Sequence, residues 1–293
     1  MKNLLSLMTV LTLCLSAFSS FAQEKCVGTN DQFKGPVGLQ IYSLRNTFNE
    51  NVELGMEITE NLGFHYVEID NTHGMEPEEF LKLLEKHHLK PVSAHWDFNM
   101  FDKNPEQVIK EAKALGLEYA GVAWLPHEGD FDEAECRKAI EVFNRAGELF
   151  AKEGIKIFLH NHGYEFQPYG DKGETLFDLF VQETNPETVF LQMDVLWTVF
   201  PGQDPVALLK KYPNRFVTFH LKDLKKGVEG DLSGGTSVEN DVALGTGQVN
   251  YPELLKTAQE CGVRYYFIED ESPVVLTQLP QSLKYLESVH WEE

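Results

Sequence analysis

Several short apolar runs in this sequence end in side chains that can bind a metal ion or move a proton. The last four of these runs end in His160, Asp194, His220 and Glu269. Imidazole nitrogens and carboxylate oxygens are the ligands that Mn, Co, Zn and Fe ions take in proteins. Carboxylates gathered in one cavity without a cation would repel one another. If these side chains converge, they therefore predict a site for one divalent metal ion.

The other runs end in polar or aromatic residues suited to holding a substrate. We expect a substrate-binding group consisting of Gln40, Tyr42, His95, Trp124 and Trp197. The two tryptophans either stack on a sugar face or pack in the core. Lys222 follows His220 by two residues, and it either binds substrate oxygens or pairs with Asp194 or Asp223.

The elements that must position these side chains alternate between two patterns. Strand-length runs rich in β-branched and aromatic residues cover 37–42, 65–70, 91–95, 119–124, 155–160, 189–194, 216–221 and 265–269. Amphipathic stretches separate them, and several of these stretches end in glycine, as expected of helix C-caps. Eight strands alternating with helices predict an α/β fold, a single-domain (β/α)8 TIM barrel, whose strand ends meet at one mouth. A doubly wound open sheet is the alternative, which the lack of a glycine-rich loop after the first strand disfavours.

The ends of the chain and one long internal segment do not fit the repeating pattern. Residues 1–22 have the basic start, apolar centre and small-residue end of a cleaved signal peptide, which predicts a periplasmic or secreted protein. Residues 23–35 are expected to form a flexible lead-in, and residues 36–293 the barrel domain. The glycine-rich segment 225–249 is either a lid or site-forming loop, or a loose surface insertion.

Composition excludes some partners. The chain has 46 acidic and 25 basic side chains and a formal net charge of −21. Such a chain lacks the basic surface that nucleic acid or an anionic membrane requires. We expect a small-molecule sugar or glycoside as partner, with no nucleic acid and no membrane after signal cleavage. A homo-oligomer is compatible with the sequence.

Six motifs give the sequence a recognisable resemblance. They lie at residues 38–45, 159–166, 192–197, 219–223, 244–250 and 267–270. With these motifs the chain resembles the sugar phosphate isomerase/epimerase family of xylose-isomerase-like TIM barrels. The resemblance implies one divalent cation held by Asp194, His220 and Glu269. For the fifth strand, ligand preference favours Glu165 as the fourth ligand, which leaves His160 and His162, with Lys222, as catalytic residues. The alternative is that one of the two histidines is the ligand.

The resemblance also implies a class of reaction, proton abstraction next to a sugar carbonyl. Return of the proton gives isomerisation or epimerisation, whereas loss of a β substituent gives elimination. The signal peptide predicts export from the cytoplasm, and sugar phosphates are scarce outside it. We therefore expect a 3-keto-glycoside 1,2-lyase or a keto-sugar isomerase/epimerase. Two alternatives are an endonuclease-type barrel, which the net charge opposes, and a non-catalytic periplasmic sugar-binding protein, which would have no need of three metal ligands.

Overall fold

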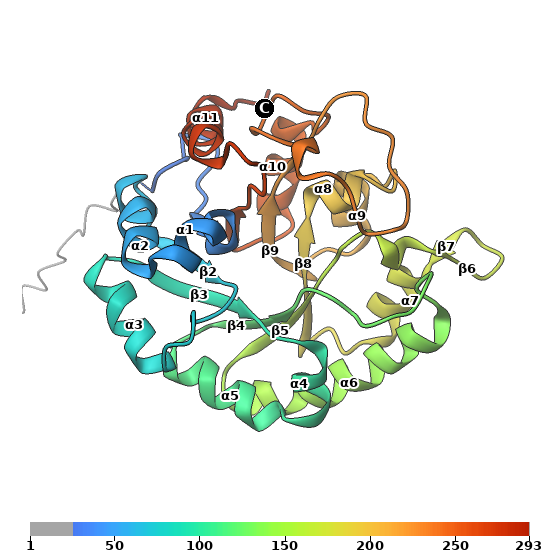
Figure 1. The fold of residues 1–293 in the computed structure, drawn as a ribbon. Helices are drawn as coiled ribbons and strands as arrows, with labels where there is room; N and C mark the ends of the chain where they lie inside the picture. The colour runs from blue at the N-terminus through green and yellow to red at the C-terminus, as the bar shows by residue number, and fades with distance from the viewer. Residues whose placement is uncertain (1–25, 293) are drawn as a thin grey trace, which may run out of the picture.

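The computed structural model describes residues 26–292, and in this part of the chain eight parallel strands close into a barrel (Figure 1). The barrel strands, in the order in which they pair, are β1 (Val37–Gln40), β12 (Tyr265–Ile268), β9 (Phe216–Leu221), β8 (Val189–Asp194), β5 (Lys156–His160), β4 (Tyr119–Val122), β3 (Lys90–His95) and β2 (Tyr66–Ile69), which pairs with β1 again. The predicted (β/α)8 TIM barrel is confirmed, and each predicted strand is present.

Helices surround this barrel (Figure 1). They are α1 (Arg45–Glu50), α2 (Val52–Asn61), α3 (Pro77–Lys86), α4 (Phe98–Lys103), α5 (Pro105–Ala114), α6 (Glu133–Lys152), α7 (Leu176–Glu183), α8 (Val195–Val199), α9 (Pro205–Lys211), α10 (Tyr251–Glu260) and α11 (Val275–Ser288). The glycines expected to end helices do so: Gly63, Gly116, Gly154 and Gly262 all have positive φ. A left-handed residue at that position lets the chain turn from each helix into the next strand.

The segment before the first strand differs from the flexible lead-in expected for residues 23–35. Within its described part, the Phe33 side chain is fully buried and packs edge-to-face on Tyr266 of β12, with 5.0 Å between ring centroids. The Asn30 side-chain amide donates to the carbonyls of Leu286 and Val289 at the end of the chain. An aromatic anchor and these hydrogen bonds tie residues 26–35 to α11 and the barrel. The predicted signal peptide lies outside the described residues.

The glycine-rich segment after β9 is held by the barrel. The Asp223 carboxylate, in β10 (Asp223–Leu224), accepts backbone N–H bonds from Gly245, Gly247 and Val249. A Cβ atom at Gly247 would lie 2.3 Å from Asp223 Oδ1, so only glycine fits there. β10 also pairs with β11 (Asp241–Val242), which closes the base of the loop. The segment is therefore built onto the barrel mouth and is not a loose insertion.

None of the helices within residues 26–292 combines the length and the apolar character needed to cross a membrane.

Candidate active site

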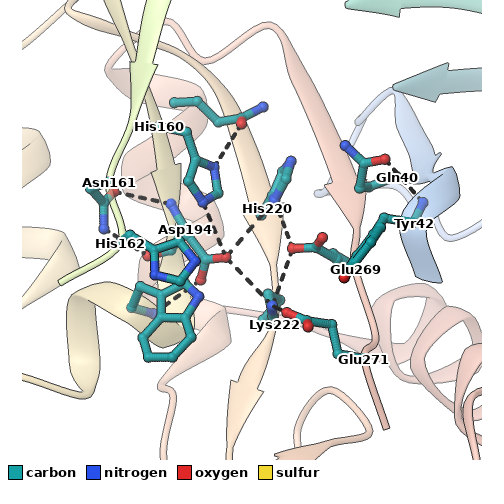
Figure 2. Close-up of polar contacts among 12 residues, drawn as sticks. Gln40, Tyr42, His160, Asn161, His162, Asp194, His220, Lys222, Glu269 and Glu271 are labelled. Atoms are coloured by element: carbon teal, nitrogen blue, oxygen red, sulfur yellow. Dashed lines mark hydrogen bonds and ion pairs between the residues drawn. The ribbon is translucent and has the colours of Figure 1, made fainter. Parts of the chain in front are cut away.

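Side chains from three adjacent strands form a buried group with the chemistry of metal ligands. Asp194, His220 and Glu269 stand at or just after the C-terminal ends of β8, β9 and β12, and their ligand atoms lie within 4.8 Å of one another. His220 Nδ1 is 3.0 Å from Glu269 Oε2 and 3.8 Å from Asp194 Oδ2 (Figure 2). These three are the ligands expected from the sequence, and the structure brings them together.

His160, at the end of β5, completes this group. Its Nε2 lies 3.8 Å from Asp194 Oδ2, and its Nδ1 lies 2.8 Å from Gln192 Oε1. Gln192 directs its amide nitrogen at the Glu68 carboxylate, 2.8 Å away, so its oxygen must face His160. The His160 proton therefore sits on Nδ1, and the Nε2 lone pair points toward Asp194. This is the tautomer that a metal ligand needs.

Asp194 supplies the observation that tests whether a cation fits. Its Oδ1 accepts the Trp197 backbone N–H at 3.0 Å, whereas Oδ2 is buried and has no hydrogen-bond partner. Burial raises the pKa of this carboxyl to about 6. The Lys222 ammonium lies 3.8 Å from this oxygen, too far for a hydrogen bond. A buried carboxylate oxygen that faces His160, His220 and Glu269 without a direct partner is costly, and a bound metal ion would satisfy it. The two carboxylates and two imidazoles fit a divalent transition-metal ion.

Glu165 does not join this group, which corrects the preferred choice for the fourth ligand. Its buried carboxylate turns back on its own loop and accepts the backbone N–H groups of His162 and Gly163 at 2.8–3.0 Å. Burial raises the pKa of the Glu165 carboxyl to about 7. The tight turn after β5 makes these amide donors the nearest partners of the side chain. The sequence alternative, a histidine ligand from this strand, agrees with the geometry.

Glu68 is a site residue for which the sequence predicted no role. It is fully buried in β2, and its carboxylate contacts His220 Nε2. Burial opposes ionisation, but His95 and His220 outweigh it and lower the pKa of Glu68 to about 2. An ionised Glu68 holds the His220 proton on Nε2 and leaves Nδ1 for a metal, the usual support for a ligating histidine. Its position at a strand end was visible, but its partner 152 residues away was not.

Lys222 lies beside the metal-ligand side chains and is surrounded by carboxylates. Its ammonium is 3.1 Å from Glu269 Oε2 and 3.8 Å from Asp194 Oδ2, and it also pairs with Glu271. Burial alone would favour the neutral amine, but these carboxylates outweigh it and raise the pKa of Lys222 well above its usual value. Lys222 is therefore a fixed positive charge. Of the two ion-pair partners expected from the sequence, Lys222 pairs with Asp194. The Asp223 carboxylate instead accepts backbone N–H bonds from the glycine-rich segment.

The comparison with known proteins now decides the family. A model of the xylose isomerase-like TIM barrel family matches residues 56–291. The chain belongs to this family. Among curated proteins, it is 25% identical over 252 residues to inosose dehydratase 2 of Bacillus cereus, which covers 76% of the chain and 83% of the relative. It is 24% identical to an inosose dehydratase of Clostridium botulinum over the same shares of each chain.

Solved structures of the family agree in fold. A sugar phosphate isomerase/epimerase from Parabacteroides distasonis is 25% identical, with a TM-score of 0.72, over 85% of this chain and 92% of that one. The zinc-bound IOLI protein is 18% identical, with a TM-score of 0.67, over 85% and 95%, which shows a shared fold. The predicted family is confirmed, and the inosose dehydratases and the sugar phosphate isomerase/epimerase bear the names of carbohydrate-modifying enzymes.

The residues predicted to bind substrate take different places in this xylose isomerase-like barrel. Tyr42 and Trp124 stand at the rim, 39% and 44% exposed. Gln40 and His95 lie deeper: Gln40 Nε2 donates to Glu68 Oε1 at 2.9 Å, and His95 Nε2 lies 3.0 Å from Gln192 Oε1. Tyr42 and Trp124 can therefore meet a ligand at the rim, whereas Gln40 is buried and braces Glu68.

His162 and Trp197 form a wall beside the metal-ligand group. Their rings stack with centroids 4.4 Å apart, and Trp197 is buried. His162 Nδ1 is buried without a hydrogen-bond partner. Burial and then the Lys222 charge lower the pKa of His162 to about 4, so that this imidazole is neutral near pH 7. The wall thus offers a neutral base next to a fixed cation.

Proposed function

We propose that this protein is a divalent-metal-dependent lyase that removes a proton next to the carbonyl of an oxidised sugar and expels the substituent β to it, with 3-keto-glycosides as substrates. The observation that carries the proposal is the buried Asp194 Oδ2, which has no hydrogen-bond partner and is enclosed by His160, His220 and Glu269 at the barrel mouth. A divalent ion bound there, of the Mn, Co, Zn or Fe class, would act as a Lewis acid on the sugar carbonyl.

His162 and Lys222 have the protonation states that this reaction requires. A neutral His162 imidazole accepts the C2 proton. Lys222 stays positive beside the oxygen that becomes negative as that proton leaves. The C2–H and C1–O bonds break, a C1–C2 double bond forms, and the aglycone leaves as an alcohol after taking up one proton. Atoms and charge balance without an oxidant or reductant.

The relatives support the elimination and the metal. The curated relatives are named inosose dehydratases, and a dehydratase eliminates water. A barrel of the same fold, the IOLI protein, was solved with a zinc atom. The amino-terminal segment supports a substrate outside the cytoplasm, since its sequence has the pattern that predicts a signal peptide.

A second candidate, a keto-sugar isomerase or epimerase, rests on the likeness to the sugar phosphate isomerase/epimerase from Parabacteroides distasonis. It uses the same proton abstraction and differs in the fate of the intermediate, because the proton returns to carbon and no substituent is lost. The same residues therefore serve either reaction, and the products separate the two.

One experiment distinguishes these reactions. Metal-loaded protein is incubated with methyl 3-keto-glucoside in deuterium oxide and followed by NMR, with the His162→Gln variant as control. The lyase predicts methanol release that the variant loses. Deuterium entering C2 without methanol release would instead identify an isomerase or epimerase. If neither occurs with any of the four metals, both enzyme proposals fail and the sugar-binding alternative gains support.

A further inference from the structure

Trp124 leaves an unusually large apolar surface at the barrel mouth. It follows β4 by two residues and is 44% exposed, although it is a tryptophan. Residues just after barrel strands line the face where barrel enzymes bind their ligands. The exposed part of the ring offers an aromatic surface against which a ligand ring can pack.

The Trp124 ring is held in place by its neighbours. It stacks on His127, with 5.0 Å between centroids and 24° between planes, and meets Tyr164 edge-to-face at 4.7 Å. The Tyr164 hydroxyl accepts the backbone N–H of Leu125 at 2.7 Å, which fixes the chain beside the indole. A ring supported in this way loses little freedom when a ligand binds.

The Trp124 ring lies one side chain away from the metal-ligand group formed by His160, Asp194, His220 and Glu269. Trp124 meets His162 edge-to-face at 5.0 Å, and the His162 ring is 5.9 Å from that of His160. His160 Nε2 in turn faces Asp194 Oδ2. A sugar whose carbonyl lies at the metal-ligand group can therefore place its β substituent beside Trp124, with His162, the acceptor of the C2 proton, between the two.

The acidic charges on the loop that carries Trp124 disfavour an anionic occupant. Glu128 and Asp130 are exposed on the same loop, and Lys222 is already paired with carboxylates. An anionic substituent would meet repulsion here. We infer that Trp124 forms the leaving-group subsite and takes a neutral ring with one apolar face, either an aryl group or a second sugar. The inference rests on the proposed function, which places the oxidised sugar at the metal-ligand group.

Equilibrium binding tests this without turnover. Methyl glucoside, 4-nitrophenyl glucoside, cellobiose and 4-carboxyphenyl glucoside are titrated calorimetrically into metal-loaded wild type, Trp124→Ala, Trp124→Phe and a control, Leu54→Ala, which changes an exposed residue of α2. We expect the wild type and the control to bind at least one neutral ring glycoside roughly three- to tenfold more tightly than the methyl glucoside. The nitrophenyl and cellobiose arms show whether that ring is aryl or sugar. The carboxyphenyl glucoside should bind less tightly than its nitrophenyl counterpart.

The variants decide the role of the indole. Trp124→Ala should lose the ring preference while keeping its affinity for the methyl glucoside, and Trp124→Phe should keep part of the preference. A preference that survives in Trp124→Ala, or no preference in the wild type, would overturn the inference. Turnover of 3-keto-glucosides is measured separately, so that a protein that binds rings at Trp124 but releases no aglycone contradicts the proposed function alone. Circular dichroism checks that each variant is folded.

Discussion

Glu68 sets the protonation of His220 from beneath the candidate metal site. Its carboxylate accepts hydrogen bonds from Gln40, Ser93 and Gln192 and also contacts His220 Nε2. Every partner is a donor, so that only an ionised carboxylate satisfies all of them. His220 is thereby oriented before any metal arrives, and Glu68 is a positioning residue for its Nδ1.

Replacing Glu68 tests this positioning role. In Glu68→Gln, the side-chain NH2 group replaces one carboxylate oxygen and faces groups that are themselves hydrogen-bond donors. The negative charge that orients His220 is also lost. We expect metal affinity to fall roughly 10- to 100-fold, as for other supports of ligating histidines. Competition with a chromophoric chelator measures it. Ser93→Ala is the matched control, because it removes one hydrogen bond to Glu68 and leaves the charge. Equal affinity in Glu68→Gln and wild type would contradict the role.

At this scale the sequence could identify residue types but not the path of each loop. Asp194, His220 and Glu269 were predictable because a strand end fixes where the side chain lies. Glu165 stands five residues beyond the end of β5, where the turn at Gly163 directs its carboxylate at backbone N–H groups. Ligand chemistry favoured it, whereas the geometry of the turn decides against it.

At the scale of elements, Asp178 joins two helices on the outside of the barrel. One carboxylate oxygen accepts the Thr175 N–H and closes the capping box of α7. The other accepts from Lys211 at the end of α9 and from the hydroxyl of Tyr212. Burial would raise the pKa of Asp178, but these two partners outweigh it and lower the pKa.

This lowered pKa has a consequence for stability. A carboxyl whose folded pKa lies below its unfolded value stabilises the protein above the unfolded pKa, and the contribution is lost as the pH falls through the folded value. We expect Asp178→Asn to lower the free energy of unfolding by about 1–2 kcal/mol at pH 7. The difference from wild type should shrink below about pH 4, near the unfolded pKa. Urea unfolding at pH 7 and pH 3 measures both values, and a difference that grows in acid would contradict this account.

The elements themselves were largely predictable, because apolar runs mark the barrel strands and glycines mark the helix ends. The two short strands after β9 were not predictable. β10 and β11 contain two residues each and depend on pairing across 16 intervening residues. No local pattern identifies so short a strand. The role of Asp223 as the acceptor for the glycine-rich loop likewise appears only once the chain is folded.

At the scale of the whole molecule, the segment before β1 is part of the fold. The fully buried Phe33 ring lies against Tyr266 of β12. Composition alone made this segment look flexible, because one buried aromatic residue can anchor a polar stretch without any periodic pattern.

Truncating that anchor should destabilise the barrel. We expect Phe33→Ala to lower the free energy of unfolding by about 3–5 kcal/mol, because a large buried ring is removed. Metal stoichiometry in the folded variant should match wild type. Chemical denaturation and metal analysis give the two values. A loss below about 1 kcal/mol, the size expected of a surface change, would show that the segment is not part of the core.

Metal removal should also act on the whole barrel. The proposed metal site exists only in the folded barrel, and a ligand that binds only the folded state stabilises it by about 3–4 kcal/mol at 100 to 1,000 times its Kd. We expect the melting temperature to rise by several degrees on metal loading. In Asp194→Asn, used as the control, metal should have little effect. Identical melting of chelated and metal-loaded wild type would contradict the site.

The most direct test of the central claim is elemental analysis of three proteins after metal loading and dialysis: wild type, His160→Gln and Glu165→Gln. The account predicts about one divalent ion per chain in the wild type and in Glu165→Gln, and little in His160→Gln, because His160 faces Asp194 whereas Glu165 caps its own loop. Metal retained in His160→Gln but lost from Glu165→Gln, or a wild type that holds none, would contradict it.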